Sequence, residues 1–286
     1  IDENRSIRAQ KLDLEPAQLQ RLTAFLVDEV QPENREYLYD YYLNNCSTRV
    51  RDAIDLALGG ALADRYRPLD APQTWRDQTR RLTAPDFWLY LGLEIGLGAP
   101  VDRRISLWDE MFIPGELADA AVTMEITRDG TVRPLVTEDV MLFESSLQAP
   151  PLSPPTVWPR YLLASLIVLG LAWLLCHWIP AGGLARGWLA LGGLLGAVLL
   201  LLWLGTDHAV TRLNLNLLIF NPLWFLLAFW RRKSRLPLYL VSGISLVALL
   251  MPWLPPQQYT LDVLAAFLPL NLASAWVLSW RRRAAS

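Results

Sequence analysis

The chain has 286 residues, and its 26 Lys and Arg against 28 Asp and Glu give a formal net charge of -2. A chain without a basic surplus lacks the charge signature of nucleic-acid binding, so we expect no nucleic-acid partner. Charged, mixed sequence before about Pro150 gives way to long apolar runs after Pro159, a change that predicts more than one domain.

Cysteine and histidine are each used twice, as Cys46, Cys176, His177 and His208. Two cysteines cannot form a disulfide framework, and Cys176 lies inside an apolar run. The spacing of these four residues does not match a zinc site. We therefore expect neither a metal ion nor another cofactor.

The half before the apolar runs predicts an α+β domain at residues 1–148. Loose alternation over residues 5–13 is typical of a strand, and Pro16 suits the first turn of a helix that ends near residue 30. Further helices are expected in "CSTRVRDAIDLAL", "PQTWRDQTRRL" and "DFWLYLGLEIGLG". The stretch "AAVTMEITRDGTVRPLVTEDVMLF" predicts a hairpin turning at Asp129 and Gly130. Residues 149–159 form a Pro-rich linker.

Cys46 follows two asparagines at the expected start of a helix. Asn45 is a good N-cap, which places Cys46 at the first helical position, and Gly59-Gly60 ends the helix. The positive end of the helix dipole favours a thiolate there, and Arg49 adds positive charge one turn on. These features indicate a nucleophile, with Asn45 and Arg49 placed to contact its substrate.

A second interpretation makes Cys46 a buried packing residue. Cys46, Val50, Ile54, Ala57 and Leu58 share one helical face. Cysteine is among the residues most often buried, so packing is the commoner role on residue statistics alone.

The half after Pro159 predicts an all-α membrane bundle at residues 160–283. A spanning helix needs about 20 mostly apolar residues to cross roughly 30 Å of hydrocarbon. Five segments are candidates: Tyr161–Ile179, Gly187–Leu204, Leu213–Trp230, Leu236–Leu254 and Leu261–Trp280. Asn214, Asn216 and Asn221 interrupt the third, which makes it the weakest of the five transmembrane helices.

Basic residues are concentrated on one side of this arrangement. That side carries Arg186, the cluster Arg231, Arg232, Lys233 and Arg235, and Arg281–Arg283, whereas the other side carries Arg160 and Arg212. By the positive-inside rule the basic side is cytoplasmic. We therefore expect a cytoplasmic (inner) membrane protein with an extracytoplasmic N-terminal domain and a cytoplasmic C-terminus.

The outward loop between the second and third membrane helices is polar. Asp207, His208, Arg212, Asn214 and Asn216 are costly to place so near hydrocarbon without a partner. Histidine titrates near neutral pH, so His208 could act as a general base. Arg212 is suited to the phosphate or carboxylate of a lipid or lipopeptide headgroup. The alternative is that His208 is an ordinary polar residue of an interfacial loop.

Several stretches carry a family resemblance: "YLYDYYLNNCSTRVRDAIDLALGG", "TWRDQTRRLT", "LGLG", "SLWDEMFIPGEL" and "TDHAVTRLNLNLLIFNPL". Together they resemble the Lnb-type family of bacterial membrane proteins. The resemblance implies a papain-like extracytoplasmic thiol domain on a small helical bundle, with Cys46 as the nucleophile. It also implies lipoprotein transacylase activity, in which an acyl chain moves from the diacylglyceryl group to the lipoprotein's own N-terminal amine.

In the permuted thiol enzymes that share this Asn-Cys helix start, the general-base histidine lies on a strand upstream of the cysteine. The printed sequence has no histidine before Cys46, and it begins at Ile1 with neither an initiator methionine nor a signal peptide. We expect a segment upstream of Ile1 to contain the base. Within the printed sequence, His208 is the candidate.

Three functions remain open on these observations. The leading hypothesis is a membrane-bound thiol acyltransferase that acts on acyl esters of lipoproteins or lipids through a Cys46 thioester. The rivals are a non-enzymatic envelope protein with a partner-binding outer domain, and a papain-like peptidoglycan peptidase. The polar residues from Asp207 to Asn216 favour membrane lipids and lipoproteins as partners over a soluble peptide.

Overall fold

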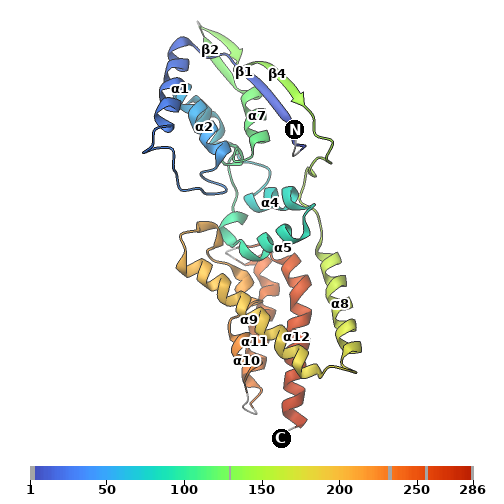
Figure 1. Cartoon of the computed structure of the whole chain (residues 1–286). Helices are drawn as coiled ribbons and strands as arrows, with labels where there is room; N and C mark the ends of the chain where they lie inside the picture. Colours follow the sequence, from blue (N-terminus) through green and yellow to red (C-terminus); the bar gives the residue numbers. More distant parts are fainter. Residues whose placement is uncertain (1–3, 129, 231–233, 255–256, 285–286) are drawn as a thin grey trace. The chain divides into compact units, whose positions relative to one another are not determined.

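The computed structural model describes residues 4–128, 130–230, 234–254 and 257–284 (Figure 1). The chain forms two compact units, one of Ile1–Trp75 with Arg104–Pro150 and one of Arg76–Arg103 with Pro151–Ser286. The first unit contains Cys46, and the second contains the long apolar segments. This division differs from the expected domain at residues 1–148, because residues 76–103 fold with the apolar segments.

The first unit combines helices with short antiparallel sheets. Its helices are α1 (Pro16–Glu29), α2 (Cys46–Ala57), α3 (Ala61–Tyr66), α6 (Leu107–Glu110) and α7 (Pro114–Thr123). Its strands are β1 (Ile7–Leu12), β2 (Glu125–Arg128), β3 (Thr131–Pro134) and β4 (Val136–Phe143). Among the described residues, β1 pairs with β4 and β2 with β3, in two separate sheets. The unit is therefore α+β in content, as expected.

The expected hairpin is split by a buried leucine. β2 and β3 pair on either side of Gly130, whose φ of 74° is readily adopted by glycine, whereas Asp129 lies outside the described residues. Leu135 follows β3, is fully buried, and donates its N–H to the Met124 carbonyl at 2.8 Å. The chain after Leu135 leaves the hairpin, and β4 pairs with β1 instead.

The core of the first unit gathers the inner faces of several helices. Leu62, Met111 and Leu135 are at most 1% exposed within it. Helix α1 lies at its edge, because none of its residues, all of which the structure describes, is buried. The apolar spacing of α1 predicts the helix correctly, but Leu19 and Leu26 remain about half exposed.

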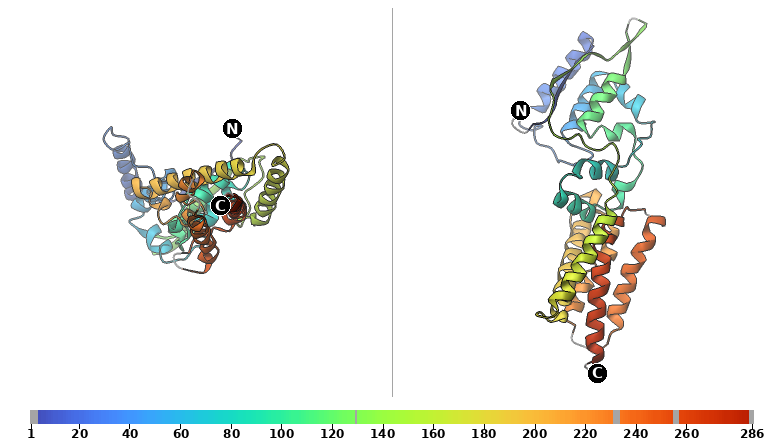
Figure 2. Two further views of the ribbon diagram at one scale, coloured as in Figure 1. Left: turned by 90° about the horizontal axis from the view of Figure 1, so that it is seen from below. Right: turned by 90° about the vertical axis from the view of Figure 1, so that its right-hand side faces the viewer.

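The second unit is helical in its described residues. It contains α4 (Trp75–Thr83), α5 (Phe87–Gly96), α8 (Trp158–Leu175), α9 (Ala181–Gly205), α10 (Leu223–Ala228), α11 (Leu236–Val247) and α12 (Leu261–Ala284). Four 3-10 turns connect them: η1 (Ala99–Asp102), η2 (Ala209–Thr211), η3 (Leu215–Leu218) and η4 (Ala248–Trp253). Helix α12 packs against α8 and α9, and it runs side by side with α8 in Figures 1 and 2.

Four stretches of the described residues are long and apolar enough to cross a membrane: Trp158–Leu175, Ala181–Gly205, Ala209–Ala228 and Leu261–Trp280. The third is a chain of two 3-10 turns and the short α10, with Asn214 at the start of η3. The expected helix Leu236–Leu254 is a shorter α11 continued by η4. Within the described residues the structure thus gives four candidate spans, and the expected count of five is not confirmed. Arg231, Arg232 and Lys233 of the expected cytoplasmic cluster lie outside the described residues.

Two glycines bring α9 against the broken third stretch. A Cβ at Gly193 would lie 2.1 Å from the backbone nitrogen of Phe225, and a Cβ at Gly196 would lie 1.7 Å from the carbonyl oxygen of Phe220. Small residues let helices approach closely where lipid supplies no hydrophobic driving force. Glycine is therefore required at both positions for this packing.

Candidate functional site

The start of α2 is fixed by a reciprocal cap. Oδ1 of Asn45 accepts from the Thr48 N–H at 2.9 Å, and the Asn45 N–H donates to Oγ1 of Thr48 at 2.8 Å. Nδ2 of Asn45 donates to the carbonyls of Tyr41 and Phe112, both at 2.9 Å. The side chain therefore both accepts and donates, as a carboxamide can. The predicted N-cap, and Cys46 as first helical residue, are confirmed.

The structure exposes Cys46 to solvent, so the interpretation of Cys46 as a buried packing residue is wrong. Helix α2 turns Ala53 and Ala57 into the core, while Val50, one turn after Cys46, is 52% exposed. The apolar face that Cys46 shares with Val50 reaches the core only toward the C-terminal end of the helix. The thiol is therefore accessible.

The Tyr37 phenol lies beside the Cys46 thiol. Desolvation, and then the interaction with Cys46, raise the pKa of Tyr37. Arg49 forms an ion pair with Glu29, and its guanidinium lies 5.1 Å from the centroid of the Tyr37 ring. Arg49 therefore contacts the ring of Tyr37, the residue beside the thiol, and its positive charge is paired with Glu29. No sequence pattern predicts Tyr37 or Glu29 at this site, because both precede α2 by a stretch of chain whose length no spacing rule fixes.

The segment that leads into α2 exposes apolar side chains. They are Leu38, Tyr39, Tyr41 and Leu43, each between 46% and 86% exposed. Asn44 and Asp40 close this segment by exchanging backbone hydrogen bonds of 3.0 and 3.1 Å. A tight turn therefore presents apolar surface just before the exposed cysteine.

Asp207 and His208 lie in the second unit, between α9 and η2, and both are exposed. Oδ1 of Asp207 is 4.0 Å from a guanidinium nitrogen of Arg212, an ion pair that is open to solvent and so contributes little stability. Asp207 and Arg212 line an open hollow of about 450 Å³ at the end of α9, together with Trp203 and Thr206. His208 belongs to a different unit from Cys46.

Asn214 and Asn216 are buried and hold the end of α5. Nδ2 of Asn214 donates to the carbonyls of Ile95 and Gly96 at 2.8 and 3.0 Å, and Nδ2 of Asn216 donates to those of Glu94 and Ile95 at 2.8 and 3.0 Å. The last carbonyls of a helix have no partner within it, so these amides act as its C-terminal cap. The headgroup contact expected of the two asparagines stays a prediction.

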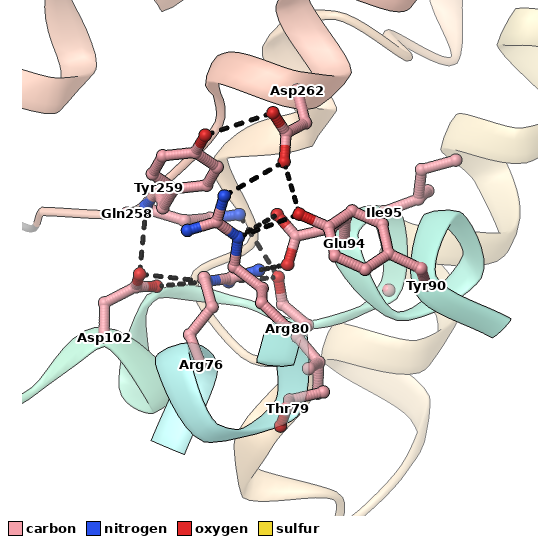
Figure 3. Close-up of polar contacts among 12 residues, drawn as sticks. Arg76, Thr79, Arg80, Tyr90, Glu94, Ile95, Asp102, Gln258, Tyr259 and Asp262 are labelled. Atoms are coloured by element: carbon pink, nitrogen blue, oxygen red, sulfur yellow. Dashed lines mark hydrogen bonds and ion pairs between the residues drawn. The ribbon is translucent and has the colours of Figure 1, made fainter. Parts of the chain in front are cut away.

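A buried ionic cluster joins α4, α5, η1 and the start of α12 (Figure 3). Nε of Arg76 is 2.9 Å from both carboxylate oxygens of Asp102, and its other guanidinium end reaches Glu94 at 3.4 Å. Arg80 lies 3.8 Å from the centroid of the Tyr259 ring and contacts Asp262 at 3.3 Å. The two arginines are therefore held by carboxylates from three different elements.

Glu94 is the least satisfied member of this cluster. It is 1% exposed, and its Oε2, 4.0 Å from Nε of Arg80, accepts no hydrogen bond from the described residues. Burial raises the pKa of Glu94 to about 7, although Arg76 and Arg80 oppose the shift. Two sequence signals for this cluster went unused: a glutamate inside the apolar run of α5 and an aspartate at the second residue of α12.

Metal-binding groups are not found among the described residues, where no three His, Cys, Asp or Glu side chains could hold one ion. The site residues therefore offer a thiol, a phenol, an imidazole and guanidinium groups. Such groups support nucleophilic and acid–base chemistry.

Fold and sites together define a membrane protein in which an α+β domain with an exposed helix-start cysteine is joined to a helical membrane domain. Family comparison agrees, since residues 1–81 match the Lnb N-terminal periplasmic domain and residues 158–283 match the Lnb transmembrane domain. The chain belongs to the Lnb-type family, as a membrane protein with a periplasmic N-terminal domain and several transmembrane helices. Searches of curated proteins and of solved structures gave no match.

Proposed function

We propose that the protein is a thiol acyltransferase that takes acyl chains from lipoproteins or membrane lipids and uses Cys46 as its nucleophile. The observation that carries this proposal is the exposed thiol of Cys46 at the first position of α2, beside the Tyr37 hydroxyl. The first turn of a helix and a neighbouring hydroxyl group are both suited to a cysteine nucleophile. Family membership supports a membrane-attached substrate.

The chemistry has two balanced steps. The thiolate of Cys46 attacks the carbonyl carbon of an acyl ester, so that a C–S bond forms and the ester C–O bond breaks. The departing oxygen takes the proton that the base removed from the thiol, which gives a thioester and a lyso alcohol. An amine then attacks the thioester, so that a C–N bond forms and the C–S bond breaks, and the proton lost by the amine returns to the sulfur. The first-turn N–H groups of α2 that precede the capped N–H of Thr48 are suited to the negative oxygen of each tetrahedral intermediate.

His208 is our candidate for the base within the printed sequence. It is an exposed histidine in a loop that the expected topology places outside the membrane. Asp207 and Arg212 flank it and line the hollow at the end of α9, where a phosphate or carboxylate could bind Arg212. We propose that Asn214 and Asn216 support this loop from inside, since both are buried and donate to the carbonyls at the end of α5.

Asn45 and Arg49 act next to the nucleophile. Asn45 positions the first turn of α2 through its cap, and Arg49 carries positive charge toward the thiol through Tyr37. The exposed apolar side chains from Leu38 to Leu43 offer a surface for an acyl chain. We further propose a papain-like arrangement for the periplasmic domain, an inner-membrane location and a cytoplasmic C-terminus.

A reconstituted assay tests this function. The protein in liposomes receives a diacylated lipopeptide, and mass spectrometry follows the N-acylated and lyso products. We expect Cys46→Ala to abolish product formation, and Cys176→Ala, which removes the other exposed cysteine, to leave it unchanged. Full activity in Cys46→Ala would reject the proposal.

The same assay addresses the base. If His208 removes a proton in the rate-limiting step, His208→Ala lowers kcat by about 100-fold or more and leaves KM nearly unchanged. An unchanged kcat would show that His208 is not the general base, and the proposed role of Cys46 as nucleophile would still stand.

A further inference from the structure

Helix α5 buries its polar side chains and exposes its apolar ones, which is the reverse of the arrangement in a water-exposed helix. Its polar side chains, Tyr90 and Glu94, lie one turn apart and are 3% and 1% exposed. Trp88, Leu89 and Gly92 form its outer face, and Trp88 is 79% exposed. A helix of a soluble domain turns its apolar side chains inward, whereas polar residues of a membrane helix face the protein interior.

The polar side chains on the inner face of α5 lie against other elements of the second unit. Tyr90 donates to Asp262 of α12 at 2.7 Å, and Glu94 faces Arg76 and Arg80 of α4. The carbonyls at its C-terminal end accept from Asn214 and Asn216. The polar side chains of α5 therefore have their partners inside the protein, and its outward surface is entirely apolar.

Contacts with α8 show where α5 lies along the membrane helices. The ring of Phe87 packs edge-on against Tyr161 with centroids 5.9 Å apart, and the ring of Tyr90 lies 6.4 Å from the same residue. Tyr161 is in the first turn of α8, three residues after Trp158. Tyrosine and tryptophan at a helix end mark the membrane–water interface. Figure 1 shows α5 crosswise to α8 and α12, at the end where both begin.

Helix α8, which α5 contacts through Tyr161, also exposes apolar side chains. Leu163, Leu166 and Ile167 of α8 are each more than half exposed, in a helix that belongs to the transmembrane domain. α5 has 10 residues, about 15 Å at 1.5 Å per residue, and is too short to span roughly 30 Å. A short apolar helix at this level fits the boundary between headgroups and acyl chains.

We propose that α5 is an interfacial membrane helix whose outer face, Trp88, Leu89 and Gly92, lies in the headgroup–acyl boundary of the bilayer. The membrane domain then includes residues 87–96 in addition to its spans. The ionic cluster of Arg76, Arg80, Glu94 and Asp262 is consequently shielded from lipid by α5.

Spin labels on the full-length protein in phosphatidylglycerol–phosphatidylethanolamine nanodiscs test this placement. Both cysteines are replaced by serine, and a nitroxide is attached at Trp88→Cys, at Leu89→Cys, at Leu166→Cys as a lipid-exposed reference, and at Leu56→Cys as a water-exposed reference in α2. Collision rates with oxygen and with a water-soluble nickel chelate give the depth of each label.

We expect the labels at positions 88 and 89 to favour oxygen over the nickel chelate, with depths between those of the two references. Nickel accessibility equal to that at position 56 would overturn the proposal, since α5 would then face water. Labels immobilised and shielded from both reagents would also overturn it, because protein would then cover the helix. The two positions serve as replicates if one substitution impairs folding, which size-exclusion chromatography detects.

Discussion

The hydroxyl of Tyr90 on α5 donates a hydrogen bond of 2.7 Å to Oδ2 of Asp262 on α12. The same oxygen lies 3.3 Å from a guanidinium nitrogen of Arg80, and Oδ1 accepts from the Tyr259 hydroxyl at 3.1 Å. Asp262 is fully buried. One carboxylate therefore joins α4, α5 and the start of α12, segments far apart in the sequence.

Removal of this carboxylate should destabilise the second unit. Asp262→Ala leaves the Arg80 charge buried with one partner fewer, and breaking a buried pair in this way costs about 3–5 kcal/mol. Asp262→Asn keeps a hydrogen-bond acceptor and should lose less. Thermal unfolding in detergent, followed by tryptophan fluorescence, should give the highest midpoint for the wild type, a lower one for Asp262→Asn and the lowest for Asp262→Ala. Equal midpoints for all three would show that the cluster does not support the fold.

Glu94 should make stability fall as pH rises. Its pKa is raised to about 7 from an ordinary 4.5, mainly by burial, so the folded state binds a proton more tightly than the unfolded state. This contribution is complete below about pH 4.5 and is lost as the pH rises through about 7. The balance of charge in the cluster also predicts that stability falls as the pH rises. Two guanidinium groups, those of Arg76 and Arg80, face three carboxylates, those of Glu94, Asp102 and Asp262.

Glu94→Gln is the matched variant, because glutamine resembles the protonated acid and cannot ionise. We expect its unfolding midpoint to decline less than that of the wild type between pH 4.5 and 7. An identical pH profile for the two proteins would assign the titration to another group. A wild-type unfolding midpoint that rises between pH 4.5 and 7 would contradict the raised pKa of Glu94.

Gly196 should be intolerant of any side chain. Its Cβ would lie 1.7 Å from the carbonyl oxygen of Phe220, which is backbone and cannot rotate away. Overpacking of this kind costs about 1–3 kcal/mol or more. Gly187→Ala is the control on the same helix, since the described residues leave its Cβ open space within 4 Å. Gly196→Ala should lower the unfolding midpoint and Gly187→Ala should keep or raise it; the reverse order would contradict the packing of α9.

Asn45 should control both the stability of the first unit and the reactivity of Cys46. Asn45→Ala removes the cap of α2 and two donated hydrogen bonds, a loss of about 2–3 kcal/mol. Asn45→Asp keeps the acceptor for Thr48, loses the donors to Tyr41 and Phe112, and adds a negative charge beside the thiol. We expect iodoacetamide to alkylate Cys46 more slowly in both variants than in the wild type. Unchanged alkylation in folded Asn45→Ala would show that the cap does not position the thiol.

Local signals predicted the elements that depend on local physics. The N-cap at Asn45, the end of α2 at Gly59 and Gly60, and Pro16 in the first turn of α1 all follow from backbone rules that act within a few residues. The exposure of Cys46 did not follow, because the face it shares with Val50 meets the core only through tertiary packing. Helical spacing alone does not show which end of a face is covered.

Contacts between residues far apart in the chain could not be predicted from the sequence either. β4 joins β1 across more than 120 residues, and Arg80 meets Asp262 across 182. The pairing of Asn214 and Asn216 with the carbonyls at the end of α5 was not predicted, because backbone carbonyls carry no residue-specific signal. The third apolar segment was marked as the weakest span because of its asparagines, and the structure breaks it there into short turns.

The most direct test of the central claim is the intact mass of the protein after incubation with a diacylated lipopeptide in liposomes. We expect an added mass of one acyl chain that hydroxylamine removes, present in the wild type and in Cys176→Ala and absent in Cys46→Ala. An acyl adduct that persists in Cys46→Ala, or product formation by the wild type without any adduct under single-turnover trapping, would contradict a Cys46 thioester.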